Sequence, residues 1–406
     1  MTRHTRSAVA LTLSLSAAAG LSAQERVGAS NAPEANAGPG WTFTPSLGYV
    51  GTYDDNISLF GVRTAEEQNN DFISIYQPSL ELAYAGRHSR FGAEYSGSLM
   101  NYQTFTALNR WNQRAKIDVR RQETARLKWF ARASAAAMPS TDLIELGGIP
   151  YRSTGARTAD GRGGVVFRIS ARDSVSSSIT DQVGDFDRPA DARALLRGGH
   201  VIESLNVWRH RFGGRLSAGT DYSFRRAAIS GDVEQFSIHG VESGIEYELS
   251  PAWSFSGGAG IMYLESTPTT ESRTGPAWRA SLDRHVNSSA FHVGYVRSFI
   301  PSFGFGGTIQ NQEAGVGYRT ALFGSRRWYT DQSAVFRDDG PLTSMVEQLP
   351  LRSLRTNSVL GFAPEPWVRL EAFYSRLQQS SLRAGGQLYR NRVGFQIVTS
   401  KPVRVP

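Results

Sequence analysis

The sequence predicts an all-β fold: a transmembrane antiparallel up-and-down β-barrel of about 18 strands, with 16 as the alternative. Apolar and polar residues alternate in segment after segment from Trp41 almost to the C-terminus. Such alternation puts successive side chains on opposite faces of a strand. The N-terminus also looks like a secretory signal, and no later segment holds the ~20 apolar residues that a membrane helix needs.

Composition excludes several classes of protein. The 406-residue chain has no cysteine, which rules out a disulfide framework, a thiolate metal site, a thiol nucleophile and a lipidated cysteine. Its formal net charge is +8, and apart from Lys116, Lys128 and Lys401 the positive charge is arginine. A basic balance can indicate nucleic-acid binding, but a secreted chain does not meet nucleic acid in the cytosol, so we expect no such partner.

The first residues predict an export signal. A short positive region precedes an apolar and small-residue stretch at 8–21, and small residues follow up to Ala23. The next stretch is polar and rich in Gly, Ala, Asn and Pro, which is typical of a flexible lead. The predicted organisation is a signal peptide at 1–23, a flexible lead at 24–40, an outer-membrane barrel at 41–399 and a C-terminal tail at 400–406.

The strand segments have the length and spacing of a membrane barrel. In the closing segment, Phe395 and Ile397 share one face, opposite Arg392 and Gln396. The segments run to about 10 to 15 residues, as a tilted bilayer-crossing strand requires, whereas sandwich strands are nearer 5 or 6. Short connections such as 86–88 alternate with long ones, which places the short turns and both termini on the periplasmic side.

Several short runs stand in a characteristic order: YVGTYDDN from Tyr49 to Asn56, DFIS from Asp71, PSLEL from Pro78, DLIELGGIPY from Asp142 to Tyr151, DFDRP from Asp185 to Pro189, and RVGFQIV from Arg392 to Val398. Together they resemble the beta-barrel porin type 2 family of outer-membrane proteins. The resemblance implies an outer-membrane barrel, and some members are associated with exopolysaccharide export. The chain departs from common practice by not ending on an aromatic residue, so we expect an internal insertion signal around Phe395.

The polar strand faces are expected to line a lumen, because barrels of about 16 to 18 strands enclose an aqueous channel unless it is plugged. Cationic side chains gather on two adjacent segments and again near the closing seam, and acidic ones lie between. The candidate lumen-lining residues are Arg114, Lys116, Arg120, Arg126, Lys128, Arg132, Arg355, Arg369, Arg390, Arg392, Glu242 and Glu246. Arginine suits carboxylates and phosphates, so the lumen could favour anionic solutes such as an acidic glycan. The alternative is that these arginines pair with carboxylates on neighbouring strands and brace the wall.

No catalytic residue, metal ligand or cofactor is predicted. The chain lacks G-x-S-x-G, H-E-x-x-H and phosphate-loop elements. Acidic residues at Asp54, Asp55 and Asp185 are expected to be solvated loop charges, since their spacing matches no calcium loop.

Three functions are compatible with the sequence. They are a passive outer-membrane conduit for a polar or anionic solute, including an exit for exopolysaccharide, then a structural or adhesive barrel with a closed lumen, and last a barrel hydrolase. The expected partners are outer-membrane lipid and lipopolysaccharide, the barrel-assembly machinery and, for an exporter, polysaccharide and periplasmic export components.

Overall fold

The computed structural model describes residues 39–57, 69–138, 155–187, 198–229, 234–267, 272–302, 307–342, 351–380 and 387–405. Within these ranges one short 3-10 helix, η2 (Thr106–Leu108), accompanies the strands, and no helix is long and apolar enough to cross a membrane. The strands are β1 (Gly40–Asp54), β2 (Asp71–Ala85), β3 (Ser89–Tyr102), β4 (Arg110–Gln122), β5 (Leu127–Met138), β6 (Ala156–Arg168), β7 (Asp173–Phe186), β8 (Gly199–Arg211), β9 (Leu216–Ile229), β10 (Glu234–Ser250), β11 (Trp253–Thr267), β12 (Ser272–Val286), β13 (Ser289–Ser302), β14 (Gly307–Leu322), β15 (Ser325–Pro341), β16 (Leu351–Glu365), β17 (Val368–Ser380), β18 (Gln387–Ser400) and β19 (Val403–Val405).

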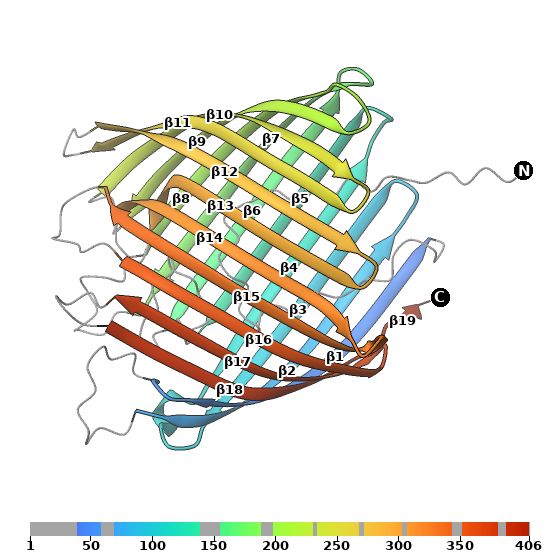
Figure 1. Cartoon of the computed structure of the whole chain (residues 1–406), viewed down its shortest axis with the longest axis vertical. Helices are drawn as coiled ribbons and strands as arrows, with labels where there is room; N and C mark the ends of the chain where they lie inside the picture. The colour runs from blue at the N-terminus through green and yellow to red at the C-terminus, as the bar shows by residue number, and fades with distance from the viewer. Residues whose placement is uncertain are drawn as a thin grey trace, which may run out of the picture.

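The sheet closes on itself. Each strand from β1 to β18 pairs antiparallel with its neighbours in the chain, and β1 also pairs with β18 (Figure 1). The register at this seam runs from Ser46 opposite Ser400 to Asp54 opposite Arg392. The predicted fold class, a closed up-and-down barrel of 18 strands, is confirmed.

The end of the chain adds a short strand to the seam. In β19, Val405 pairs with Trp41 and Val403 pairs with Phe43 at the start of β1. Part of the predicted 400–406 tail is therefore strand, and β18 itself reaches Ser400. The predicted signal peptide and nearly all of the predicted lead lie outside the described residues.

The two ends of the barrel differ. At one end, called the turn end here, short turns join the strands and the described chain ends lie together (Figure 1). In the β14–β15 turn, Phe323 and Gly324 both have positive φ, 56° and 65°. Two positive φ values belong to the tight hairpin turn that matches strand twist, and glycine tolerates this conformation without strain. The opposite end is called the loop end.

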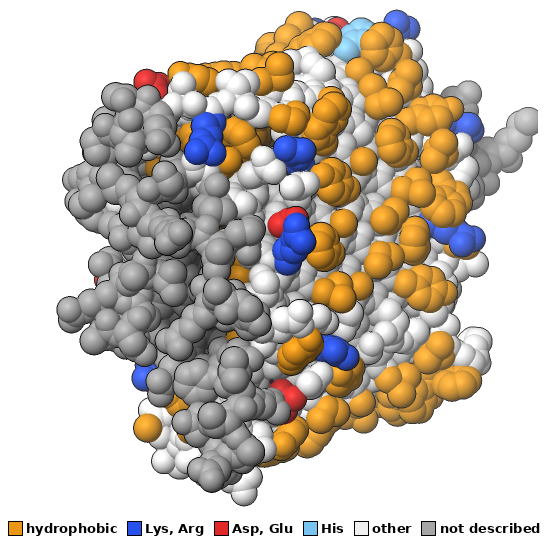
Figure 2. All heavy atoms as spheres, turned by 60° about the vertical axis from the view of Figure 1, so that its left-hand side comes forward, with side chains coloured by type: hydrophobic (Ala, Val, Ile, Leu, Met, Phe, Trp, Pro, Cys, Tyr) orange, Lys and Arg blue, Asp and Glu red, His pale blue; other side chains and the backbone are white. Residues whose placement is uncertain are grey.

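The wall has an apolar outer face and a polar inner face. Large apolar side chains cover the outer face (Figure 2). Examples at outward strand positions are Leu47, Ile117 and Ile261, which are 58%, 48% and 62% exposed. On the inner face, charged residues such as Asp54 and Arg390 are buried. A soluble fold arranges its side chains the other way round, with apolar groups inside.

One close contact on the inner face depends on a glycine. A Cβ added at Gly361 on β16 would lie 2.1 Å from the ring of Tyr329 on β15. The Tyr329 hydroxyl donates a hydrogen bond to Glu371 on β17, and the Arg319 guanidinium lies 4.7 Å from the Tyr329 ring centroid. The ring is thus held in place by two other strands and cannot move aside freely.

Gly361→Ala is therefore expected to destabilise the barrel by roughly 1–3 kcal/mol, the usual cost of forcing extra volume into a packed site. Urea unfolding followed by tryptophan fluorescence would measure it. Gly317→Ala on β14 is the matched control, because a Cβ there meets no atom within 4 Å. An equal loss in both variants would show that the Tyr329 contact is unimportant.

Candidate functional site

Cations line the inner face of β4 and β5. Asp118 is the only carboxylate on the inward faces of these two described strands, and it accepts contacts from Arg120 Nε at 3.0 Å and Arg132 Nε at 3.2 Å. Both arginines stay well exposed, at 57% and 46%. By strand alternation, the cations on this inward face are Arg110, Arg114, Lys116, Arg120, Lys128 and Arg132.

The neighbouring strands add carboxylates as well as cations to this group. Lys116 is paired in register with Glu94 on β3, and Arg132 is paired with Arg162 on β6. Arg162 donates to Ser178 at 3.4 Å and lies 5.7 Å from the Phe130 ring centroid, so it is not neutralised by a carboxylate in either contact. We call the inward cations of β4 and β5 the basic wall. Arg126, predicted to line the lumen, lies instead in the exposed β4–β5 turn.

Two members of the second predicted arginine group, Arg390 and Arg392, join the seam between β1 and β18. Asp54 is fully buried at the end of β1 and accepts from Arg390 Nη2 at 2.6 Å and Arg392 Nε at 2.7 Å on β18. Arg390 Nε adds contacts of 3.1 and 2.9 Å to the two Asp54 oxygens. On neighbouring β17, Arg369 Nε lies 3.5 Å from Glu371, while Arg355 is on the inward face of β16.

The residues after Asp54 continue this junction. The Asn391 amide groups donate to both Asp55 oxygens at 2.7 Å, and Asn56 Nδ2 donates to the Tyr389 carbonyl at 2.7 Å. The expectation that Asp54 and Asp55 are solvated loop charges is therefore wrong. They join the first and last strands of the barrel, a role that only the barrel's closure reveals.

The predicted acidic residues Glu242 and Glu246 on β10 are also paired. Arg279 on β12 contacts Glu242 at 2.6 Å and Asp221 on β9 at 2.6 Å. The contacts of this one arginine therefore reach from β12 across β11 to β10 and β9. Arg209 on β8 contacts Glu246 at 2.8 Å. Around β10 the charged residues therefore form ion pairs that brace the wall, which is the alternative interpretation given above. In the basic wall, by contrast, cations outnumber carboxylates.

The β13–β14 hairpin bends into the lumen at the loop end. Residues 272–277 of β12 have no partner on β13, and Phe299 instead packs inside the wall. Its backbone nitrogen donates to Met262 Sδ at 3.1 Å, and its carbonyl accepts from Arg225 Nη1 at 3.0 Å. Arg225 is held in turn by Glu203 at 3.0 Å. An apolar cluster of inward side chains surrounds Phe299: Val201, Ala227, Ile229, Phe236, Ile238, Met262, Leu264, Ala277 and Leu342.

A second element covers the inner wall near β1 to β3. The segment containing η2 packs Phe105 and Leu108 against a cluster that includes Ile73 and Met100. Asp71 holds it by accepting from the backbone nitrogen of Phe105 at 2.9 Å. Both this element and the β13–β14 hairpin pack inside the wall at the loop end, and they therefore narrow the lumen there. In the strand order they lie on roughly opposite sides of the barrel. The long connection between β5 and β6, residues 139–154, lies outside the described residues.

The histidines do not assemble a catalytic triad in the described part of the chain. His210 pairs with Asp173 at 2.8 Å and His292 with Asp283 at 2.7 Å, His200 contacts Asp181, and no serine hydrogen-bonds to any of them. No group of three or more metal-ligating side chains occurs among the described residues either. The expectation of no catalysis stays a prediction.

Comparison with known proteins gives likeness in architecture only. No model of a known protein family matches the chain, and no curated protein matches it, so the resemblance to the beta-barrel porin type 2 family stays a prediction. Among solved structures, OccAB4 of Acinetobacter baumannii is 11% identical with a TM-score of 0.48, covering 91% of this chain and 100% of that one. The outer membrane protein OpdK of Pseudomonas aeruginosa is 11% identical with a TM-score of 0.47, covering 89% and 99%. OpdO of P. aeruginosa is 12% identical with a TM-score of 0.47, covering 90% and 98%.

Proposed function

We propose that this protein is a passive outer-membrane channel whose lumen favours anionic solutes. The observation that carries the proposal is the inverted side-chain distribution of a closed barrel, with an apolar outer face and charged residues inside. Such an outer face suits lipid, and a closed sheet leaves no unpaired edge in the bilayer. By the usual orientation of these barrels, the turn end faces the periplasm and the loop end the exterior.

The preference for anions rests on the basic wall. On β4 and β5 one carboxylate, Asp118, faces several exposed cations, while the carboxylates near β10 are already bound by arginines. Exposed guanidinium and ammonium groups beside a water path raise the local concentration of anions. The inward elements that narrow the lumen at the loop end limit the size of the solute, and the basic wall selects its charge.

The test is a reversal-potential measurement in planar bilayers under a potassium chloride gradient. The wild-type protein is expected to prefer chloride. The variant Lys116→Gln/Arg120→Gln/Lys128→Gln should reduce the chloride-to-potassium permeability ratio roughly three- to ten-fold, because the local potential of the wall falls. Arg132 is kept so that Asp118 retains a partner.

A matched control removes the same charge elsewhere. Arg172 and Arg215 lie in exposed turns, and Arg352 sits on β16 at 69% exposure beside Asp338. Replacing these three arginines by glutamine should leave the permeability ratio nearly unchanged. Cation preference in the wild type would reject the anion channel, and a folded barrel that never conducts would favour a structural or adhesive barrel with a closed lumen.

Exit of an exopolysaccharide is a narrower proposal within the same function. It is motivated by the family resemblance and by the affinity of arginine for uronic-acid carboxylates. An acidic oligosaccharide added on the turn side should block the current in brief events that a neutral oligosaccharide of equal length does not cause. Equal blocking by both sugars would show that size alone decides passage.

A further inference from the structure

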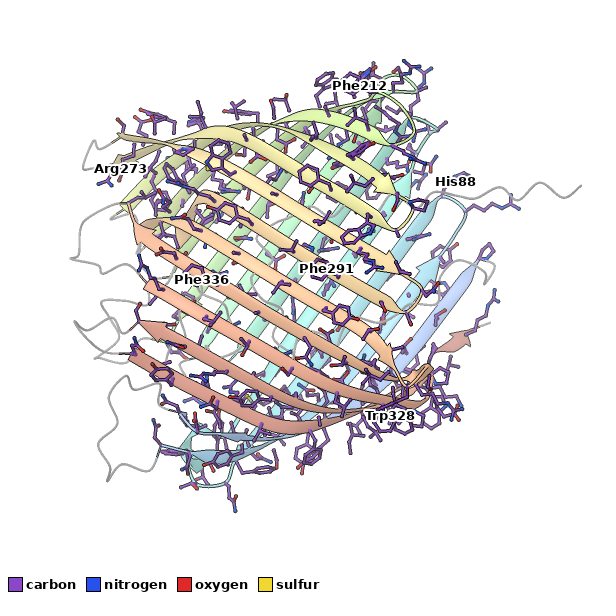
Figure 3. The ribbon with its side chains drawn as sticks, in the orientation of Figure 1. His88, Phe212, Arg273, Phe291, Trp328 and Phe336 are labelled. Atoms are coloured by element: carbon purple, nitrogen blue, oxygen red, sulfur yellow. The ribbon has the colours of Figure 1, made fainter. Side chains whose placement is uncertain are left out.

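A cleft of about 510 Å³ lies at the turn end between the β2–β3 and β4–β5 turns. Its lining includes Tyr84, Arg87, His88, Arg121 and Glu123. Backbone hydrogen bonds fix both turns and join them, since the Gln122 nitrogen donates to the His88 carbonyl at 2.7 Å. The cleft is therefore a formed feature of two hydrogen-bonded turns. Figure 3 marks His88 at the turn end, far from Arg273 at the loop end.

The outer side of the cleft adjoins an aromatic cluster on the apolar face. The Tyr84 ring lies 4.9 Å from the Trp41 ring, and Trp41 lies 5.9 Å from Phe91, measured between centroids. Aromatic side chains at the end of the apolar band mark the interface between hydrocarbon and headgroups in membrane barrels. The cleft thus opens at the depth where lipid phosphates lie, given the membrane location proposed above.

The charge of the cleft is positive. Arg121 Nε contacts Glu123 at 2.8 Å, while its side chain remains 51% exposed. Arg87 is exposed and forms no ion pair with a carboxylate among the described residues. Two arginines and one histidine therefore face a single carboxylate. The planar donor fork of arginine matches phosphate oxygens, and the cleft volume is in the range of small-ligand sites.

We infer that this cleft binds the phosphate headgroup of an anionic glycerophospholipid from the surrounding leaflet. Arg87 and Arg121 hold the phosphodiester oxygens, and the Tyr84 ring packs along the glycerol and the first carbons of the acyl chains. A lipid is favoured over a dissolved phosphate because the cationic cleft is continuous with the aromatic cluster of the apolar face, which a free ion would not contact.

Native mass spectrometry of the detergent-purified barrel tests the site, with phosphatidylglycerol and phosphatidylcholine offered in equal amounts. The first bound lipid is expected to be phosphatidylglycerol by roughly ten-fold. Both headgroups carry the phosphodiester, but the quaternary ammonium of phosphatidylcholine places a further positive charge close to the two arginines, and a repulsion of about 1.4 kcal/mol corresponds to that factor. Arg87→Gln/Arg121→Gln should abolish the preference. Arg172→Gln/Arg215→Gln, in two other turns, should keep it.

Three results would overturn the inference. The first is an absence of headgroup preference in the wild type, and the second is an equal loss in the control variant, which would indicate general charge attraction. The third is that inorganic phosphate displaces the bound lipid at the same concentration as a short-chain phosphatidylglycerol does. That result would indicate a site for a soluble anion. Chloride conductance measured on the same samples separates failure of this site from failure of the proposed channel.

Discussion

Asp54→Asn is expected to weaken the barrel more than any other single charge change described here. Asp54 is fully buried, and it balances Arg390 and Arg392, which are 7% and 24% exposed. Asparagine keeps the shape but removes the negative charge that both arginines contact. Breaking a buried pair in this way costs about 3–5 kcal/mol. The loss should appear as a lower urea midpoint and a lower temperature at which the barrel band shifts on a denaturing gel.

Two further variants decide whether charge at the seam is responsible. Asp338→Asn removes a carboxylate whose partner, Arg352, is 69% exposed, and it should cost less than about 1 kcal/mol. Asp54→Asn/Arg390→Gln should recover part of the loss, since one buried positive charge is removed together with the negative charge of Asp54. Equal stability of Asp54→Asn and Asp338→Asn would show that the seam does not depend on this pair.

Phe299→Ala is expected to enlarge the conducting path. The Phe299 ring fills the space over Gly275, where a Cβ would lie 2.4 Å from the ring. Truncating a buried phenylalanine costs about 3–5 kcal/mol. If that energy holds the β13–β14 hairpin against the wall, its loss shifts the hairpin toward the detached position by roughly 10²- to 10⁴-fold. Single-channel recordings should show a higher mean conductance with more frequent switching between levels.

Phe336→Ala is the matched control for this measurement. Phe336 lies on the outward face of β15 and is 45% exposed, so the same truncation there leaves the lumen unchanged. Conductance is expected to stay at the wild-type value. If Phe299→Ala also leaves conductance and switching unchanged, the inward hairpin does not control the width of the path.

The sequence predicted the barrel well because its strands obey a local rule. Alternation of side chains is visible within one strand, as with Phe395 and Ile397 opposite Arg392 and Gln396, and it placed these residues on the faces that the structure shows. The even strand number follows from the alternation of short and long connections. The basic wall could be found for the same reason, since its cations recur at alternate positions on adjacent segments.

The seam and the hairpin could not be found in this way. Asp54 and Arg390 are 336 residues apart in sequence, so nothing local shows that they meet. Phe299 has the same strand parity as outward residues such as Tyr295, and only the bend of β13 turns it toward Gly275. One signal was present: Pro276 lies in the stretch of β12 that has no β13 partner, and proline is confined to strand edges because it lacks a backbone donor.

The buried junction at Asp54 also bears on how the barrel finds its correct closure. Hairpins between consecutive strands form locally, whereas joining β1 to β18 requires the two ends of the chain to meet, which makes it the slowest contact to form. Sliding β18 by one residue against β1 would turn Arg390 and Arg392 to the lipid side and leave Asp54 buried without them. The charges that stabilise the finished seam therefore also disfavour misaligned closures of the barrel, so they help to select the correct register in the last step of assembly.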